Sequence, residues 1–170
     1  MTKDHMRPDE GEHLADIPGV TWKVQGYLQS FIERVFVQGT SHFLFDSGSV
    51  AVGVFVWSKE PENPEAHTFV RMFANLVWGL NDTPALHQYV AYHTNDFVFG
   101  HLALSKTDTG QVTVFLRHDL LGDYLDQDEL KAAVVGLVNA ADTLGDELVA
   151  MFGGSKFAVR EGQRPFFLSE

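Results

Sequence analysis

Residues 69–78, FVRMFANLVW, decide which fold the rest of the chain can adopt. Side chains along a β-strand point alternately to the two faces of a sheet. One set in this stretch is largely aliphatic, and it consists of Val70, Met72, Ala74, Leu76 and Trp78. The other set mixes aromatic with polar groups, and it consists of Phe69, Arg71, Phe73, Asn75 and Val77. The pattern predicts a strand with one face in a core and the other available to a partner.

Four further segments read as strands. In residues 112–119, one face of the predicted strand has Val112, Val114 and Leu116, and the opposite face has Thr113, Phe115, Arg117 and Asp119. In residues 97–104, one face has Phe97, Phe99 and His101, and the opposite face has Val98, Leu102 and Leu104. Residues 42–45 and 50–59 flank the turn sequence DSGS and predict a hairpin. The second of these is apolar on both sides, which predicts that something covers Phe55 and Trp57.

Three segments carry the apolar spacing of helices. In residues 20–36, apolar side chains recur at steps of three and four, and Thr21 or a neighbour could cap the helix. Residues 84–95 begin at Pro84 directly after the capping residue Thr83. Residues 127–152 follow the capping residue Asp126 and form a helix about 39 Å long at 1.5 Å per residue.

The elements therefore follow the order α-β-β-β-α-β-β-α. We predict an α+β fold with an antiparallel five-stranded sheet and the long C-terminal helix packed on one face. A single domain of residues 19–154 is expected between a flexible N-terminal tail, 1–18, and a C-terminal tail, 155–170. The C-terminal tail is basic and rich in phenylalanine, so it could bind an acidic, aromatic surface, including one on its own chain.

Composition excludes several classes of function. The 170 residues include 23 acidic and 12 basic side chains, a net charge of −11, which argues against a nucleic acid partner. The chain has no cysteine, so disulfides and thiol chemistry are excluded. We find no signal peptide pattern and no apolar run long enough for a membrane span, and we predict a cytoplasmic protein without a membrane partner.

The sequence contains no clear catalytic, metal-binding or cofactor-binding motif. None of the eight histidines pairs with another at ligand spacing, and the carboxylates between Asp119 and Glu129 do not fit a calcium loop. Phosphate-binding loops, nucleophile elbows and dinucleotide fingerprints do not occur. We therefore predict no catalytic residues, no metal and no cofactor. A hydrolase built on His118 and the neighbouring acids would require these groups to converge.

The polar and aromatic face of the predicted sheet is the candidate binding site. Its residues are Phe55, Trp57, Arg71, Phe73, Asn75, Phe97, Phe99, His101, Phe115 and Arg117. The first predicted helix, with Trp22, Tyr27, Phe31 and Phe36, could cover this face, and so could a second copy of the chain. Otherwise the face could receive a peptide, with Arg71 and Arg117 anchoring carboxylates. A second hypothesis is a small-molecule sensor or carrier with an apolar pocket between sheet and helix.

Four stretches resemble the type III secretion chaperones and their YbjN-like relatives, most closely the actinobacterial peptide-binding chaperone-like members. These stretches are VRMFANLVWGLN (70–81), TPAL (83–86), FVFG (97–100) and HDLLGDYL (118–125). The resemblance covers residues 21–154 and implies a cytoplasmic, non-enzymatic homodimer. It also implies that a protein or peptide client is held as an extended segment, often as a strand added to a sheet edge. The tail after Gly154 is a departure from the secretion chaperones.

Overall fold

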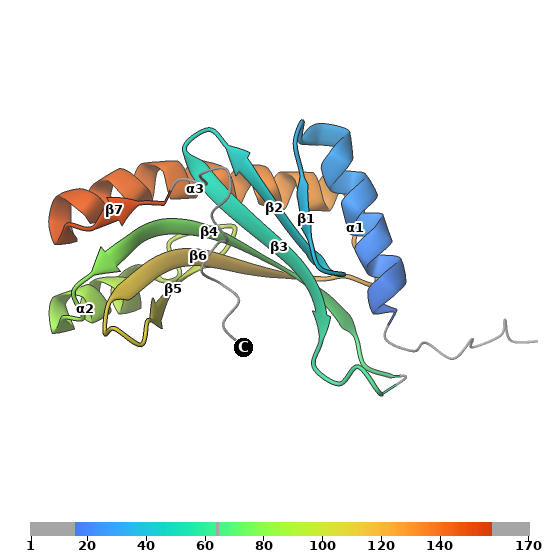
Figure 1. Cartoon of the computed structure of the whole chain (residues 1–170), viewed down its shortest axis with the longest axis horizontal. Coiled ribbons are helices and arrows are strands. Elements are labelled where there is room, and N and C mark those ends of the chain that lie inside the picture. Colours follow the sequence, from blue (N-terminus) through green and yellow to red (C-terminus); the bar gives the residue numbers. More distant parts are fainter. Residues whose placement is uncertain (1–15, 64, 158–170) are drawn as a thin grey trace, which may run out of the picture.

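The computed structural model describes residues 16–63 and 65–157, which form an α+β fold with an antiparallel sheet (Figure 1). Its elements in chain order are α1 (Ile17–Phe31), β1 (Phe36–Gln38), β2 (His42–Ser47), β3 (Val50–Ser58), β4 (Thr68–Leu80), α2 (Pro84–His93), β5 (His101–Lys106), β6 (Val112–Leu121), α3 (Gln127–Phe152) and β7 (Ser155–Lys156).

The sheet has the strand order β1-β2-β3-β4-β6-β5, and β7 pairs with β4. The long strand β4 lies at its centre, paired with β3 on one side and β6 on the other. The predicted fold class is confirmed, including the long C-terminal helix on the sheet. The described residues hold seven strands instead of five, because β1 and β7 are too short to produce an alternating pattern of their own.

Helix α3 passes behind the sheet in Figure 1 and packs mainly on β4. It begins where predicted, because the Asp126 carboxylate accepts a hydrogen bond from the Glu129 amide at 2.8 Å. It ends at Gly153, whose φ of 77° suits glycine. One stripe of the helix is buried in the core, and it comprises Leu130, Ala133, Val134, Leu137, Ala141, Leu144 and Leu148.

Helix α1 is displaced from its predicted range of 20–36. The Asp16 carboxylate caps it by accepting from the Gly19 amide at 2.8 Å, and the backbone turns extended at Ile32. The β-branched side chains that follow favour a strand, so Phe36 begins β1. The buried residues Val20, Val24 and Leu28 join the same core as α3. The expectation that this helix covers the aromatic face is therefore wrong, because its apolar stripe is already used on the aliphatic face.

Near the C-terminal end of β4, the side chains no longer alternate regularly between the two faces of the sheet. The pairing with β6 shifts register between Asn75 and Val77, and again between Val77 and Leu80. Val77 is consequently buried in the core, while Trp78 is 46% exposed. The prediction that Trp78 lies in the core and Val77 outside it is wrong. The irregular pairing interrupts the regular alternation of side chains between the two faces of the sheet. The residues that follow it therefore point to the opposite face from the one that alternation predicts.

Strand β5 begins later than predicted. Gly100 has a φ of 95°, which interrupts the extended backbone before His101. Phe97 and Phe99 therefore lie outside the strand and pack, partly buried, against the hydrophobic core. The Phe99 ring meets His118 edge to face, with centroids 5.7 Å apart. The placement of Phe97 and Phe99 on the aromatic face is thus corrected, because the alternation they continue stops at Gly100.

Two helical glycines test the packing of Phe99. Replacing Gly26 in α1 by alanine adds a methyl group where no atom lies within 4 Å, so G26A should stabilise the protein by about 0.5–1 kcal/mol. The same change at Gly136 in α3 would place a β-carbon against the Phe99 ring, and we expect G136A to destabilise by about 1–3 kcal/mol. Urea denaturation measures both free energies of unfolding. Equal stabilisation by both variants would contradict the packing of Phe99 on α3.

Candidate functional site

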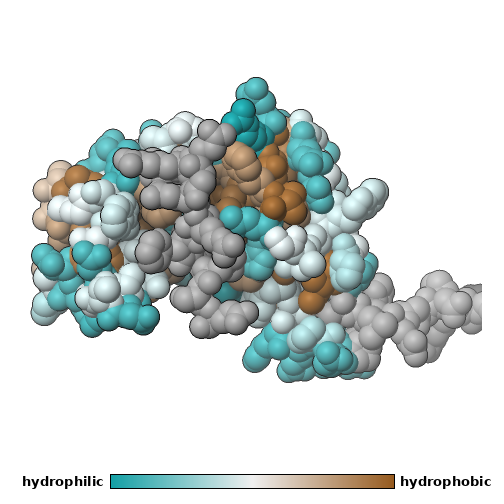
Figure 2. Space-filling model, viewed as in Figure 1, coloured by the Kyte–Doolittle hydropathy of each residue, from teal (hydrophilic) through white to brown (hydrophobic). Residues whose placement is uncertain are grey.

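The sheet face opposite the helices, called the aromatic face below, gathers most of the predicted site. The described residues form three helices, and each buries its apolar side chains in the core beneath the other face. The aromatic face is defined by Phe55, Trp57, Phe69, Arg71, Phe73, Asn75, His101, Phe115, Arg117 and Asp119, which share one side of the sheet by the register of β3 to β6. Of the predicted residues, only Phe97 and Phe99 are absent from it. Figure 2 shows hydrophobic surface on this side of the molecule, bordered by hydrophilic residues.

A diagonal row of rings, the aromatic band, crosses this face. It runs from His42 on β2 through Phe55 on β3 and Phe73 on β4 to Phe115 on β6. Successive ring centroids lie 5.3, 5.5 and 6.3 Å apart. Gly53 makes room for the band, because a β-carbon at this position would lie 2.9 Å from the Phe73 ring. The band is therefore a continuous row of aromatic rings over four strands.

Beside the band, two arginines share one carboxylate. Asp119 accepts hydrogen bonds from Arg71 Nε at 2.5 Å and from Arg117 Nη2 at 2.7 Å. Burial would raise the pKa of Asp119, but the hydrogen bonds from both guanidinium groups outweigh it and hold that pKa below its usual value. Arg71 also lies 4.6 Å from the centroid of the Trp57 ring. The three charges sum to one positive charge, so the group can still attract a carboxylate.

A hollow of about 600 Å³ opens next to these groups. Its walls include the turn between β5 and β6 and the exposed end of β4. Among its lining residues are Phe55, Phe73, Asn75, Trp78, Phe115 and Phe157. Sequence reasoning missed Trp78, because the register shift that turns it outward depends on the pairing of β4 with β6. Polar residues from the turn and the neighbouring strands, such as Thr107, Gln111 and Thr113, complete the lining, so the hollow combines aromatic contacts with hydrogen-bonding groups.

Asn75 is the unusual polar group in this hollow. It is only 3% exposed, yet neither its amide oxygen nor its amide nitrogen has a hydrogen-bond partner among the described residues. A buried amide without partners is costly, so such groups are normally paired in the functional state. A backbone amide of an extended segment offers one donor and one acceptor, which matches what Asn75 lacks.

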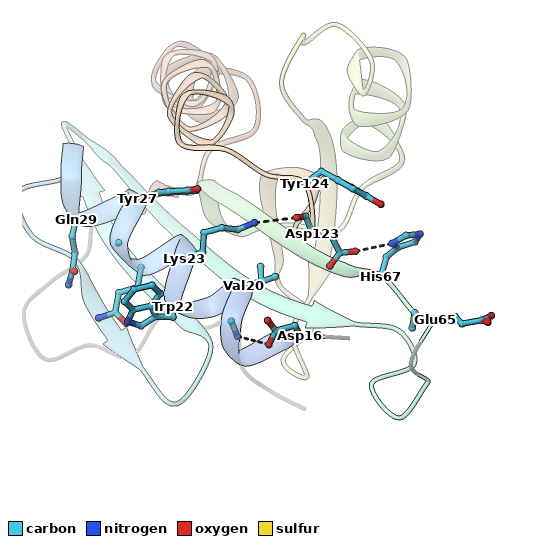
Figure 3. Close-up of a pocket in the computed structure, with 14 residues that line it drawn as sticks. Asp16, Val20, Trp22, Lys23, Tyr27, Gln29, Glu65, His67, Asp123 and Tyr124 are labelled. Carbon is cyan, nitrogen blue, oxygen red and sulfur yellow. Dashed lines mark hydrogen bonds and ion pairs between the residues drawn. The ribbon is translucent and has the colours of Figure 1, made fainter. Parts of the chain in front are cut away.

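A second hollow, of about 1120 Å³, lies beside α1 (Figure 3). Trp22 and Tyr124, both strongly exposed, contribute to its lining. The close-up shows Asp123 Oδ2 beside His67 Nδ1, at 2.8 Å, and Lys23 donating to the Asp123 carbonyl, at 3.4 Å. Lys23 also donates to the Gly122 carbonyl at 2.9 Å. Lys23, His67 and Asp123 thus have hydrogen-bond partners, whereas the side-chain amide of Asn75 has none among the described residues.

In the part of the chain that the structure describes, His118 and Asp119 lie in different layers. His118 and Asp119 are neighbours on β6, and His118 contacts Phe99 near the core while Asp119 lies on the aromatic face. The condition for the hydrolase hypothesis, that these groups converge, is not met. Burial lowers the pKa of His118, with a smaller opposing effect of Asp119. Within the described ranges, no three His, Asp or Glu side chains gather as a metal ion would need.

The predicted C-terminal tail is described only at its beginning. Ser155 and Lys156 form β7, and Phe157 lines the hollow on the aromatic face. Residues 158–170 lie outside the described residues, as do residues 1–15 of the predicted N-terminal tail.

Comparison with protein families now identifies the chain. Residues 42–160 match the model of TY-Chap1, described as "T3SS (YopN, CesT) and YbjN peptide-binding chaperone 1". The chain belongs to the TY-Chap1 family. The matched range contains every strand of the aromatic face and all of α3, so the predicted resemblance to secretion chaperones and YbjN-like proteins is confirmed. A comparison with curated proteins finds no match.

The TY-Chap1 match begins after α1 and extends beyond β7 into the C-terminal tail. None of the helices in the described ranges combines the length and apolarity needed to cross a bilayer.

The shared carboxylate leads to a pH prediction. Because the folded pKa of Asp119 is lowered, its contribution to stability is present above its unfolded pKa of about 3.9 and is lost as pH falls through the folded pKa. We expect D119N to destabilise the protein by about 1.5–3 kcal/mol at neutral pH, and by less at more acidic pH. Urea denaturation at several pH values measures this difference, with the exposed Glu62 variant E62Q as control. A D119N effect that stays constant from neutral to acidic pH would contradict the ion-pair account.

Proposed function

We propose that this TY-Chap1 protein binds an extended, aromatic segment of a client protein across the aromatic face. The observation that carries this proposal is an aromatic hollow whose buried Asn75 has both hydrogen-bonding groups unused among the described residues. Membership of a peptide-binding chaperone family supports a peptide as the ligand class.

The spacing of the rings supports an extended conformation of the client. Alternate side chains of a β-strand lie about 6.6 Å apart on the same side. The rings of the aromatic band lie at similar intervals of 5.3 to 6.3 Å. An extended segment can therefore set alternate side chains against successive rings. Its backbone pairs with the buried amide of Asn75 once the side chains over that amide move aside. The positive charge left over at Arg71, Asp119 and Arg117 favours an acidic side chain nearby.

Strand addition offers the client a second contact. The outer strands β1 and β5 have one unpaired edge each within the described sheet, and an extended segment could pair there. β5 lies next to the hollow, because Ser105 belongs to both. A client can thus contact the edge and the aromatic face together.

Further parts of the proposal come from the sequence. We expect a non-enzymatic homodimer that acts in the cytoplasm, as the acidic composition, the lack of cysteine and the resemblance imply. Light scattering measures the mass in solution. The small-molecule alternative, with an apolar pocket between sheet and helix, stays a prediction. The sheet and α3 are joined there by fully buried side chains such as Leu137 and Met72, and the described hollow with free polar groups lies on the other face.

The test compares two aromatic side chains. We expect F115A to weaken the binding of a labelled short peptide, in which Phe and Leu alternate with Ser and Thr, by about tenfold or more. Y92A is the matched control, because Tyr92 on α2 is strongly exposed and lies outside the hollow. Fluorescence anisotropy measures the affinities, and thermal unfolding checks that both variants fold.

Unchanged affinity in F115A would contradict the proposed face. A loss of affinity in W22A, with F115A unaffected, would place the peptide in the hollow beside α1 instead.

A further inference from the structure

Strand β4 is longer than its neighbour β3, and this leaves an edge open. Pairing between the two strands ends at Ala51 and Asn75, so the end of β4 has no partner on that side from β3. The short strand β7 occupies this edge, with Lys156 opposite Val77 and Ser155 opposite Trp78. The chain therefore adds a strand of its own beside the aromatic hollow.

The side chains of Lys156, in β7, and Phe157, directly after it, lie on opposite sides of the sheet. Lys156 Nζ binds Asp146 Oδ1 on α3 at 2.8 Å and lies 3.8 Å from Asp142 Oδ1. The next residue, Phe157, lines the hollow on the aromatic face together with Asn75 and Phe115. The lysine thus anchors the segment to the helix, and the phenylalanine enters the candidate binding site.

Gly154 sets the direction in which the chain leaves α3. Its φ is 78°, and a β-carbon there would lie 2.7 Å from the Trp78 carbonyl oxygen and 2.8 Å from Val77 Cγ1. Only glycine allows this close approach to β4. The junction therefore directs the following residues back along β4, where Ser155 and Lys156 pair with it.

We infer that residues 158–170 of the same chain bind the aromatic face and compete with the client for it. The segment reads AVREGQRPFFLSE and contains the apolar run Phe166, Phe167 and Leu168. Extended at about 3.3 Å per residue, it can span roughly 40 Å, more than the roughly 24 Å between the outer strands of a six-stranded sheet. Its two arginines, Arg160 and Arg164, are balanced by Glu161 and Glu170, so the segment is neutral overall and offers carboxylates to the positive charge at Arg71, Asp119 and Arg117. The inference rests on the proposed function, because it assigns a competitor to the same site.

The tether makes even weak binding effective. A short flexible connection gives an effective concentration on the order of 1 mM, so a segment with an intrinsic Kd of about 100 μM occupies its site in about nine chains of ten. The site is then free in only about one chain of ten, and the apparent affinity of the protein for a client falls about tenfold.

The experiment compares three forms of the protein with two peptides. The forms are the full chain, the chain ending at Phe157, and the full chain carrying Phe166→Ser and Phe167→Ser, which keeps the length of the tail. The peptides are the labelled Phe and Leu peptide described above and a synthetic peptide of residues 158–170. We expect both altered proteins to bind the first peptide about tenfold more tightly than the full chain. The tail peptide should bind the chain ending at Phe157 and displace the first peptide from it.

Equal affinity of the first peptide for all three forms would overturn the inference and leave the proposed function intact. If the first peptide binds none of them, the proposed function fails, and the tail peptide decides the inference separately. Failure of the tail peptide to bind the chain ending at Phe157 would then overturn the inference as well.

Discussion

The packing of helices on only one face of the sheet is the constraint on which the rest of this structure depends. Strand β4 turns Val70, Met72 and Ala74 towards α3, and these side chains are fully buried. Helices α1 and α2 bury their own apolar residues in the same core. Because all the described helices pack on the aliphatic face, no described helix covers the aromatic rings and arginines of the opposite face. The proposed binding site is a consequence of this asymmetry.

The uncovered face is ordered by contacts within it and not by a second core. Arg71 lies between the Trp57 ring and the Asp119 carboxylate, and Asp119 also holds Arg117. These contacts fix the arginines, and Phe73 rests over Gly53. The groups are therefore held in place without a ligand, and the proposed binding of a client there would cost less entropy. Asn75 is the exception, because its amide lacks partners among the described residues and has hydrogen bonds to gain from a ligand.

Much of this arrangement could be predicted from the sequence, for physical reasons. Alternation in regular strands places Phe55, Arg71 and Phe115 on one face without knowledge of their partners. The caps of α2 and α3 are local, so Thr83 and Asp126 were correct as starting points. Alternation failed wherever pairing was irregular. Trp78 moved outward at the register shift of β4, and Phe97 and Phe99 left the face because Gly100 interrupts the strand. The end of α1 depends on tertiary contacts that periodicity does not contain.

Nuclear Overhauser effects between the bound Phe and Leu peptide and the isotope-labelled chain ending at Phe157 test the central claim most directly. They report which protein atoms lie within a few ångströms of the peptide. The account predicts contacts to the rings of Phe55, Phe73 and Phe115 and to the side-chain amide of Asn75. Contacts confined to Trp22, Tyr27 and the rest of the hollow beside α1 would contradict it.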